Sequence, residues 1–164
     1  MKYGKINKTD IANGPGVRVT LFVSGCERRC KGCFNPETWN FDYGEEFTSE
    51  TLAEILEAMA PDYISGLTVL GGEPLHSRNF LWVSWICARV KIAYPNKSVW
   101  VYTGDSYEDI DYLSMLDYVD VVVDGAFIEE EKDFTLKFRG SRNQRIIDVK
   151  ATREAGTIKL LENT

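Results

Sequence analysis

Hydrophobic and polar residues alternate in several short segments of the chain, and a turn follows each of them. Residues 17–23 alternate and are rich in β-branched side chains, which predicts a strand that ends at Ser24. Similar apolar segments predict three further strands, at residues 67–70, 98–102 and 118–123. The turns after these strands contain glycine, and the last strand leads into Asp124 and Gly125.

Helices are expected between these strands. The first is predicted to begin after Thr48 or Ser49, to end near Pro61, and to bury a face formed by Leu52, Ile55, Leu56 and Met59. In the second, which Pro95 ends, the apolar residues that recur at helical spacing are Leu81, Trp85, Ala88 and Ile92. A third helix is expected over residues 107–116.

The alternation of strands and helices predicts an α/β fold with a mainly parallel sheet built from right-handed βαβ units. We expect one domain spanning residues 1–164, with a highly charged and partly irregular segment after about residue 126. In parallel sheets of this kind, ligands bind at the carboxyl ends of the strands. Each unusual motif of the sequence lies at such an end.

Composition narrows the class of protein. The chain is 44% hydrophobic, which supplies enough apolar material for a core, and its formal charge is −6. Nucleic-acid-binding proteins usually carry a basic stripe, so the acidic balance argues against nucleic acid as the main partner. The first residues lack the apolar run of a signal peptide, and no stretch approaches the length of a membrane span. A soluble, cytoplasmic protein is therefore expected.

Three of the four cysteines lie within eight residues, at Cys26, Cys30 and Cys33. This spacing favours metal binding over a disulfide framework, because thiolates are the ligands that both zinc and iron-sulfur clusters prefer. A structural zinc site needs four ligands, and the spare candidates, Cys87 and His76, lack ligand spacing. A zinc-stabilised interaction module without catalysis remains the alternative. On a four-iron cube, three thiolates leave one iron open to a small molecule with an amine and a carboxylate, such as S-adenosylmethionine.

This C-x3-C-x2-C spacing resembles that of the radical S-adenosylmethionine enzymes. Within them, the chain is similar to the organic-radical-activating enzymes, and most of all to the branch that activates anaerobic ribonucleotide reductase. The motifs that carry the likeness run in collinear order from about Asn13 to Gln144: Asn13-Gly14-Pro15-Gly16, Leu21 to Cys26, Gly32-Cys33-Phe34-Asn35, Gly71 to His76, Val101-Tyr102-Thr103-Gly104, Val123-Asp124-Gly125 and Phe138-Arg139-Gly140-Ser141.

The resemblance implies a partial (β/α) barrel with a 4Fe-4S cluster on Cys26, Cys30 and Cys33. Reductive cleavage of S-adenosylmethionine at this cluster would give a 5'-deoxyadenosyl radical, which abstracts hydrogen from a glycine of the partner. The implied partners are the large subunit of anaerobic ribonucleotide reductase and a reduced flavodoxin-like electron donor. Another substrate, such as pyruvate formate-lyase, remains an alternative within the same family.

The resemblance also implies a set of cofactor-binding residues. The glycine turn Gly71-Gly72-Glu73 would bind the methionine amine of the cofactor. The third cysteine, Cys33, is flanked by Gly32 and Phe34, whereas the wider family often has an aromatic residue before it. Two later strands end in polar residues, Thr103 and Asp124, which could meet the ribose or carboxylate of the cofactor. The basic residues Arg139, Arg142 and Arg145 are either a solvated face or a contact with cofactor or partner.

Overall fold

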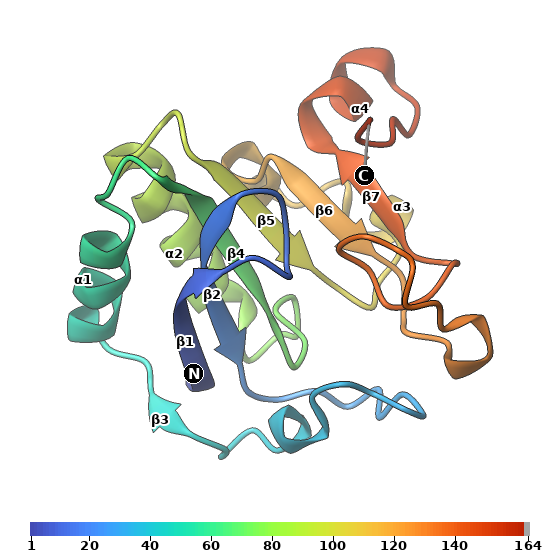
Figure 1. Ribbon diagram of the computed structural model, residues 1–164, viewed down its shortest axis with the longest axis horizontal. Helices are drawn as coiled ribbons and strands as arrows, with labels where there is room; N and C mark the ends of the chain where they lie inside the picture. Colours follow the sequence, from blue (N-terminus) through green and yellow to red (C-terminus); the bar gives the residue numbers. More distant parts are fainter. Residues whose placement is uncertain (163–164) are drawn as a thin grey trace.

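A computed structural model describes residues 1–162, which form a seven-stranded mixed sheet with helices packed on it (Figure 1). The strands are β1 Lys2–Asp10, β2 Val17–Val23, β3 Glu45–Glu46, β4 Ile64–Gly71, β5 Ser98–Tyr102, β6 Val121–Asp124 and β7 Arg145–Asp148. The α-helices are α1 Ser49–Ala58, α2 Phe80–Ala93, α3 Tyr107–Ile110 and α4 Val149–Ala155. Short 3-10 helices lie at Pro36–Trp39, Ser114–Tyr118 and Glu129–Glu131.

The strand order is β3-β1-β2-β4-β5-β6-β7. The four central strands, β2, β4, β5 and β6, are parallel neighbours, which confirms the predicted α/β class. The outer strands are antiparallel: β1 pairs with β2, β3 with β1, and β7 with β6. Strand β1 was not predicted from the sequence. It is mostly polar and buries only Tyr3 and Asp10, so it shows no hydrophobic alternation.

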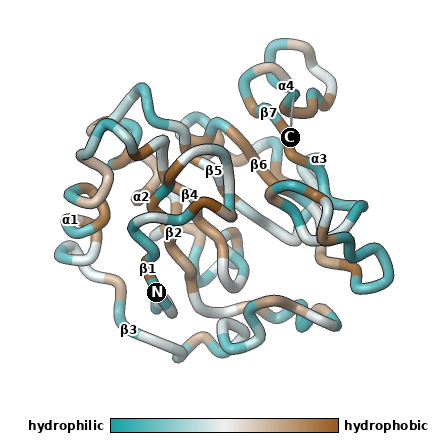
Figure 2. The backbone as a smooth tube through the Cα atoms, viewed as in Figure 1, coloured by the Kyte–Doolittle hydropathy of each residue, from teal (hydrophilic) through white to brown (hydrophobic). Residues whose placement is uncertain are grey.

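Alternation along the central strands separates two faces of the sheet. In β2, Val19, Leu21 and Val23 point into the core beneath α1 and α2, whereas Arg18 and Thr20 are buried on the opposite face. That opposite face holds a second, smaller cluster formed by Trp100, Val121, Val123 and Ile146. Figure 2 shows that the central strands are largely hydrophobic, whereas the loops near the C-terminus are mostly polar. The second face is therefore the one left open for a site.

Helix α1 forms as predicted. Thr48 is its N-cap, and the side chains of Thr48 and Thr51 each accept from the other's backbone amide, at 3.4 and 3.1 Å. The expected face is buried at Leu52, Ile55 and Met59, with Leu56 packed at its margin. The local capping signal and the apolar spacing agreed here, so the sequence was sufficient.

Helix α2 ends before Pro95 as predicted, but the apolar residues that recur at helical spacing there are not the ones that the helix buries. Leu81 and Ile92 are 75% and 73% exposed and Trp85 is 38% exposed, and the buried residues are instead Val83, Ile86, Cys87 and Val90. The helix is apolar on all sides, so two different stripes satisfy the same helical spacing. Only contact with the sheet selects one of them.

Truncation of the two stripes of α2 should therefore have unequal effects. Ile86→Ala removes a fully buried side chain and is expected to lower the free energy of unfolding by about 2–4 kcal/mol. Leu81→Ala, in the exposed stripe, is expected to change it by less than about 0.5 kcal/mol. Urea unfolding of both variants, prepared in the same way, measures the difference. Equal losses would contradict the assignment of the buried face.

The predicted helix over residues 107–116 is broken into α3 and the 3-10 helix Ser114–Tyr118. In a continuous helix, Leu116 would lie on the side opposite Tyr107, because nine residues at 100° each amount to a half turn beyond two full ones. The break allows Tyr107 and Leu116 both to be buried. As a result, β6 begins at Val121 rather than at Tyr118.

The charged C-terminal segment folds across the second face of the sheet. Its residues between β6 and β7 contain only one short 3-10 helix, as expected for a partly irregular segment. Tyr102 of β5 donates its hydroxyl to the carbonyl oxygen of Phe138 at 2.5 Å, and the Phe138 ring packs edge-on against Trp100. Helix α4 then begins at the Asp148 cap and ends at Gly156. Within residues 1–162, no helix has the length and apolar character that crossing a membrane would require.

Candidate functional site

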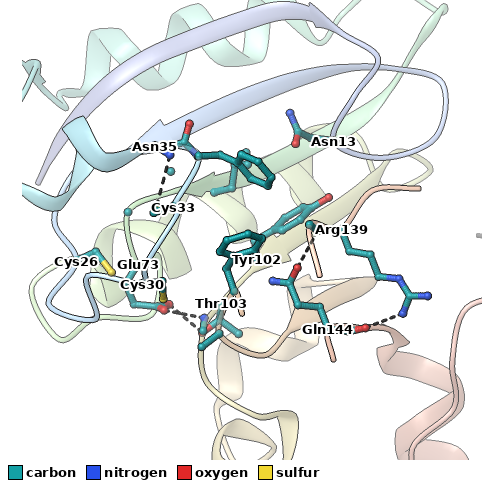
Figure 3. A pocket seen from close by; sticks show the side chains of 18 of the residues that line it. Asn13, Cys26, Cys30, Cys33, Asn35, Glu73, Tyr102, Thr103, Arg139 and Gln144 are labelled. Carbon is teal, nitrogen blue, oxygen red and sulfur yellow. Dashed lines mark hydrogen bonds between the residues drawn. The ribbon is translucent and has the colours of Figure 1, made fainter. Parts of the chain in front are cut away.

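A cavity of about 530 Å³ opens on the second face, at the carboxyl ends of β2, β4, β5 and β6. Most of the residues predicted to form the site line it: Cys26, Cys30, Cys33, Phe34, Gly71, Gly72, Glu73 and Thr103. Gly32 and Asp124 are not among its lining residues. In the view of Figure 3, the cysteines lie on one side of Tyr102, and Arg139 and Gln144 lie on the other. Topology therefore gathers residues that are more than a hundred positions apart in the chain.

The cysteines lie in an irregular loop, residues 24–35, which directly follows β2. Backbone hydrogen bonds hold its start, because Gly25 and Cys26 donate their amides to the carbonyls of Thr38 and Trp39 at 2.6 and 3.1 Å. Its far end is turned by a bond from the amide of Cys33 to the carbonyl of Cys30, at 3.1 Å. The three thiols are thus carried by a loop whose ends are fixed and whose middle is free of regular structure.

All three cysteine thiols of this loop are free and partly buried. Burial raises the pKa of the Cys26 thiol, so a thiolate there needs a nearby positive centre such as a metal. The amide of Asn35 already donates to the sulfur of Cys33, at 3.4 Å. Among residues 1–162, no three cysteine, histidine or acidic side chains are gathered closely enough to hold a single metal ion. The three cysteines all line the same cavity, and thiolates are the ligands that iron-sulfur clusters prefer.

The structure removes both spare ligands of the zinc alternative. Cys87 is fully buried in α2, where burial raises its pKa to about 12, and it is absent from the cavity wall. His76 also lies outside the cavity: its Nδ1 accepts from the amide of Arg78, and its Nε2 is 3.4 Å from a carboxylate oxygen of Glu27. Neither can complete a four-ligand zinc site with the three loop thiols as they stand.

The Gly71-Gly72 turn ends β4 and lies against the start of the cysteine loop. Gly71 has a φ of +110°, and a Cβ on Gly72 would lie 2.5 Å from the carbonyl oxygen of Gly25. The amides of Gly72 and Glu73 donate to the carbonyls of Val23 and Gly25, at 2.7 and 2.8 Å. Two glycines are therefore needed to bring the turn this close to the loop that carries the cysteines.

Glu73 is buried with its carboxylate at the cavity wall. One oxygen accepts from the Thr103 hydroxyl at 2.8 Å and from the amide of Leu75 at 3.1 Å. The other accepts from the amide of Gly104 at 2.8 Å and from Nε of Arg28 at 3.3 Å. The carboxylate thus joins the ends of β4 and β5 to the cysteine loop, and Thr103 is brought to the site mainly as its partner (Figure 3).

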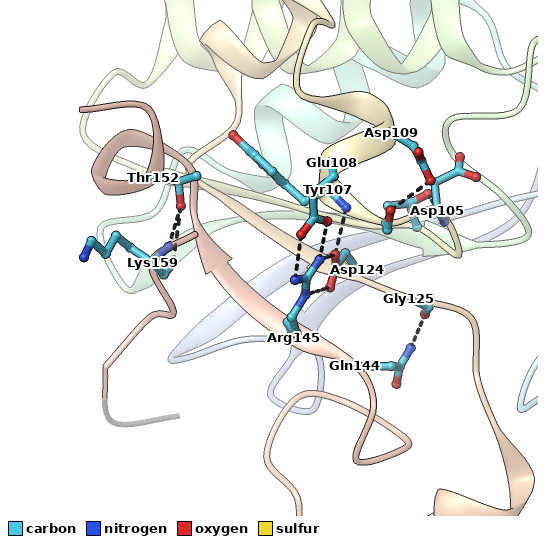
Figure 4. A network of polar contacts seen from close by, with 12 residues as sticks. Asp105, Tyr107, Glu108, Asp109, Asp124, Gly125, Gln144, Arg145, Thr152 and Lys159 are labelled. Atoms are coloured by element: carbon cyan, nitrogen blue, oxygen red, sulfur yellow. Dashed lines mark hydrogen bonds and ion pairs between the residues drawn. The ribbon is translucent and has the colours of Figure 1, made fainter. Parts of the chain in front are cut away.

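Asp124 belongs to a different network (Figure 4). Its buried carboxylate accepts from the amide of Tyr107 at 2.8 Å and pairs with Arg145, whose guanidinium also contacts Glu108. The hydrogen bond from Arg145 lowers the pKa of Glu108 to about 2. Asp124 therefore joins β6, α3 and β7 beside the cavity rather than at its wall.

Aromatic and polar residues from several loops complete the wall. Phe22, Tyr102, Phe127, Phe134 and Phe138 contribute rings, and Asn13 comes from the turn before β2. Nothing in the sequence singles out these rings, because aromatic residues in strands and loops are common in cores. Asn13 belongs to the Asn13-Gly14-Pro15-Gly16 motif, the first of those that carry the family resemblance.

The three basic residues of the C-terminal segment have separate environments. Arg139 lines the cavity and donates to the carbonyl of Gln144 at 2.6 Å. Gln144 in turn accepts from the amides of Gly140 and Ser141, at 2.8 and 3.2 Å, which fixes this turn. Arg142 is exposed, and Arg145 is taken by Asp124 and Glu108. Of the three, only Arg139 faces the site.

Comparison with known proteins agrees with this arrangement. Residues 12–147 match the family of 4Fe-4S single cluster domains, and this range contains every residue of the cavity wall except Lys5. The anaerobic ribonucleoside-triphosphate reductase-activating protein of Enterobacteria phage T4 is 45% identical over 148 residues, which are 89% of this chain and 93% of that protein. The proteins of the same name from Vibrio cholerae and Escherichia coli K12 are 41% and 38% identical over 89% and 88% of this chain, and over 97% and 96% of their own lengths. The chain therefore belongs to the family of anaerobic ribonucleoside-triphosphate reductase-activating proteins.

Proposed function

We propose that this chain activates anaerobic ribonucleotide reductase by means of a 4Fe-4S cluster held on Cys26, Cys30 and Cys33. The single observation that carries the proposal is that three free thiols line one wall of a cavity whose other walls come from the carboxyl ends of β4, β5 and β6. The match to the 4Fe-4S single cluster domain and the names of the relatives support the same assignment.

The cluster and S-adenosylmethionine would supply the reactive chemistry, and the residues of this chain would position them. When bound, the reduced cluster supplies an electron that cleaves S-adenosylmethionine to methionine and a 5'-deoxyadenosyl radical, which abstracts hydrogen from a glycine of the reductase large subunit. Cys26, Cys30 and Cys33 would hold the cluster through three irons, and the remaining iron would be free to bind the amine and carboxylate of the cofactor. Gly71, Gly72 and Glu73 lie beside the cysteine loop, where they would receive the ammonium group.

The remaining contacts are assigned by position. Phe34 lines the cavity next to Cys33 and offers a ring for the adenine, and Gly32 lets the loop turn beside it. Thr103 would act mainly through Glu73, to which its hydroxyl donates. Asp124 would support the site from outside the cavity wall, through Arg145 and the amide of Tyr107. The aromatic wall would help to exclude water, which would protect a carbon radical from side reactions.

We also propose that residues 1–164 are one radical S-adenosylmethionine domain, with the parallel strands as part of a partial (β/α) barrel. The parallel order of β2, β4, β5 and β6, with the cavity on the face away from α1 and α2, supports this interpretation. A reduced flavodoxin-like protein in the cytoplasm would supply the electron. The charge of −6 gives no support to nucleic acid as a direct partner.

Radical formation on the partner tests the function. The protein is purified anaerobically, reconstituted with iron and sulfide, reduced, and mixed with S-adenosylmethionine and the large subunit of anaerobic ribonucleotide reductase. We expect a glycyl radical signal by electron paramagnetic resonance, together with 5'-deoxyadenosine in stoichiometric amount. The same mixture with pyruvate formate-lyase is the control. A radical on pyruvate formate-lyase alone would redirect the proposal to that substrate, and a colourless protein with stoichiometric zinc would overturn it.

A further inference from the structure

Arg28 lies between the first two cysteines, lines the cavity and contacts two acidic residues. Its Nε is 3.3 Å from a carboxylate oxygen of Glu73, and its Nη2 contacts the carboxylate of Asp105. The Arg28 side chain is 34% exposed, whereas that of Glu73 is 6% exposed and that of Asp105 is 36% exposed. One guanidinium therefore joins the cysteine loop to the ends of β4 and β5 and is shared between a buried and an exposed carboxylate.

The buried carboxylate has no vacant acceptor position while Arg28 is in place. A carboxylate offers about four lone-pair sites, and Glu73 accepts four hydrogen bonds. Two of the donors are the backbone amides of Leu75 and Gly104, which cannot leave without a change of the backbone, and the third is the Thr103 hydroxyl at the end of β5. Arg28 is the fourth, and its bond to Glu73 is the longest of the set.

The path of the Arg28 side chain depends on Gly104. A Cβ at residue 104 would lie 2.3 Å from Nε of Arg28 and 2.5 Å from its Cδ. The glycine therefore leaves room for the guanidinium between Glu73 and Asp105.

We propose that Arg28 occupies the ammonium-binding position at Glu73 and moves fully to Asp105 when the ammonium group of S-adenosylmethionine binds. The inference rests on the proposed function, because it concerns the same cofactor site at Glu73. It assigns Arg28 as the competitor of the ammonium group and Asp105 as the alternative partner of Arg28. Arg28 is a gating residue here, and it takes no part in the bond cleavage. Because Arg28 keeps its ion pair with Asp105, breaking its contact with Glu73 costs little free energy.

Two substitutions should change the affinity for S-adenosylmethionine in opposite directions if Arg28 is a gate. A purely structural clamp does not predict this difference. Arg28→Gln removes the competitor, so S-adenosylmethionine should bind about three- to fivefold more tightly, the range expected for loss of one partly exposed ion pair. Asp105→Asn removes the alternative partner, so Arg28 stays on Glu73 and binding should weaken by a similar factor. In the double variant, Asp105→Asn should have no further effect. A clamp that only holds the loop in place predicts weaker binding in both single variants.

The test uses the cluster-loaded protein, with the dissociation constant of S-adenosylmethionine measured by anaerobic isothermal titration calorimetry. Hydrogen exchange of residues 26–34 without the cofactor is the second readout, and Arg28→Gln should exchange faster there. Arg29→Gln is the matched control, since it removes the same charge from the same loop, where Arg29 lies over the Trp39 ring at 5.8 Å. Its affinity should equal that of the wild type. The iron content of each variant checks that the loop still holds its cluster.

The outcomes are distinct. Tighter binding in Arg28→Gln with weaker binding in Asp105→Asn supports the gate. Weaker binding in Arg28→Gln, or an unchanged dissociation constant in both single variants, overturns it and leaves the proposed function intact. A cluster-loaded wild type that binds no S-adenosylmethionine overturns the proposed function and the gate together.

Discussion

Alanine at Cys26, Cys30 or Cys33 is expected to abolish activation of the reductase, with a loss of at least about 100-fold in the rate of radical formation. Loss of a hydrogen-bonded neighbour of a metal ligand already costs about 10- to 100-fold in metal affinity or activity, and loss of the ligand itself costs more. The three thiols line the cavity together, and among the described residues no other cysteine and no histidine lines it to take over. Iron and sulfide content, visible absorbance and the radical assay measure the effect.

Cys87→Ala is the matched control for this prediction, because it removes the chain's remaining thiol from the core of α2. It should keep the full iron content and the full rate of radical formation, at a cost of about 1–2 kcal/mol in the free energy of unfolding. Loss of the cluster in Cys87→Ala, or a normal cluster in Cys30→Ala, would mean that the ligands have been misassigned. Circular dichroism of each variant confirms that the comparison is made between folded proteins.

Arg18→Ala is expected to be among the most destabilising single substitutions in the chain. The Arg18 side chain is fully buried on the second face of the sheet and has no carboxylate partner among the described residues. Its guanidinium donates to the hydroxyls of Thr68 and Ser98 and to the carbonyls of Leu67 and Ser98, at 2.8–2.9 Å. Burial lowers its pKa to about 10, so it remains charged at neutral pH.

Truncation would leave these acceptors unpaired and open a cavity under the turn that carries Asn13, whose carbonyl accepts from Thr68. The expected loss is about 3–5 kcal/mol in the free energy of unfolding, measured by urea denaturation. Arg153→Ala is the control, because Arg153 forms an exposed ion pair with Asp117 and should cost less than about 1 kcal/mol. A loss of less than about 1 kcal/mol in Arg18→Ala would mean that the buried bonds add no net stability.

Some residues of the candidate site could be predicted from local sequence, and others could not. The cysteine spacing is local: three thiols within eight residues must lie near one another whatever the fold, so ligand chemistry could be read from the sequence. The Gly71-Gly72-Glu73 turn and Thr103 could be placed at one edge of a sheet by the order of strands and helices. The sequence could not predict that the Thr103 hydroxyl donates to Glu73 or that Arg28 contacts the same carboxylate. Thr103 and Arg28 are 30 and 45 positions away from Glu73 in the chain.

Arg18 shows the same limit in the core. A charged residue in an alternating strand normally faces solvent, so the pattern of residues 17–23 gave no sign that this arginine is fully buried. It is buried because the turn before β2 and the C-terminal segment cover the second face of the sheet, and the acceptors come from β4 and β5. No local sequence pattern predicts that these distant segments bury Arg18.

The sequence by itself determined the α/β class, the four parallel strands, the capped first helix and the cysteine loop, because each depends on neighbours within a few residues or on the order of elements. Only the tertiary structure decided which stripe of α2 is buried, that β1, β3 and β7 close the sheet with antiparallel edges, and that Asp124 faces Arg145 rather than the cavity. Those outcomes depend on contacts between distant segments, where several local patterns fit equally well and only packing and charge pairing select one.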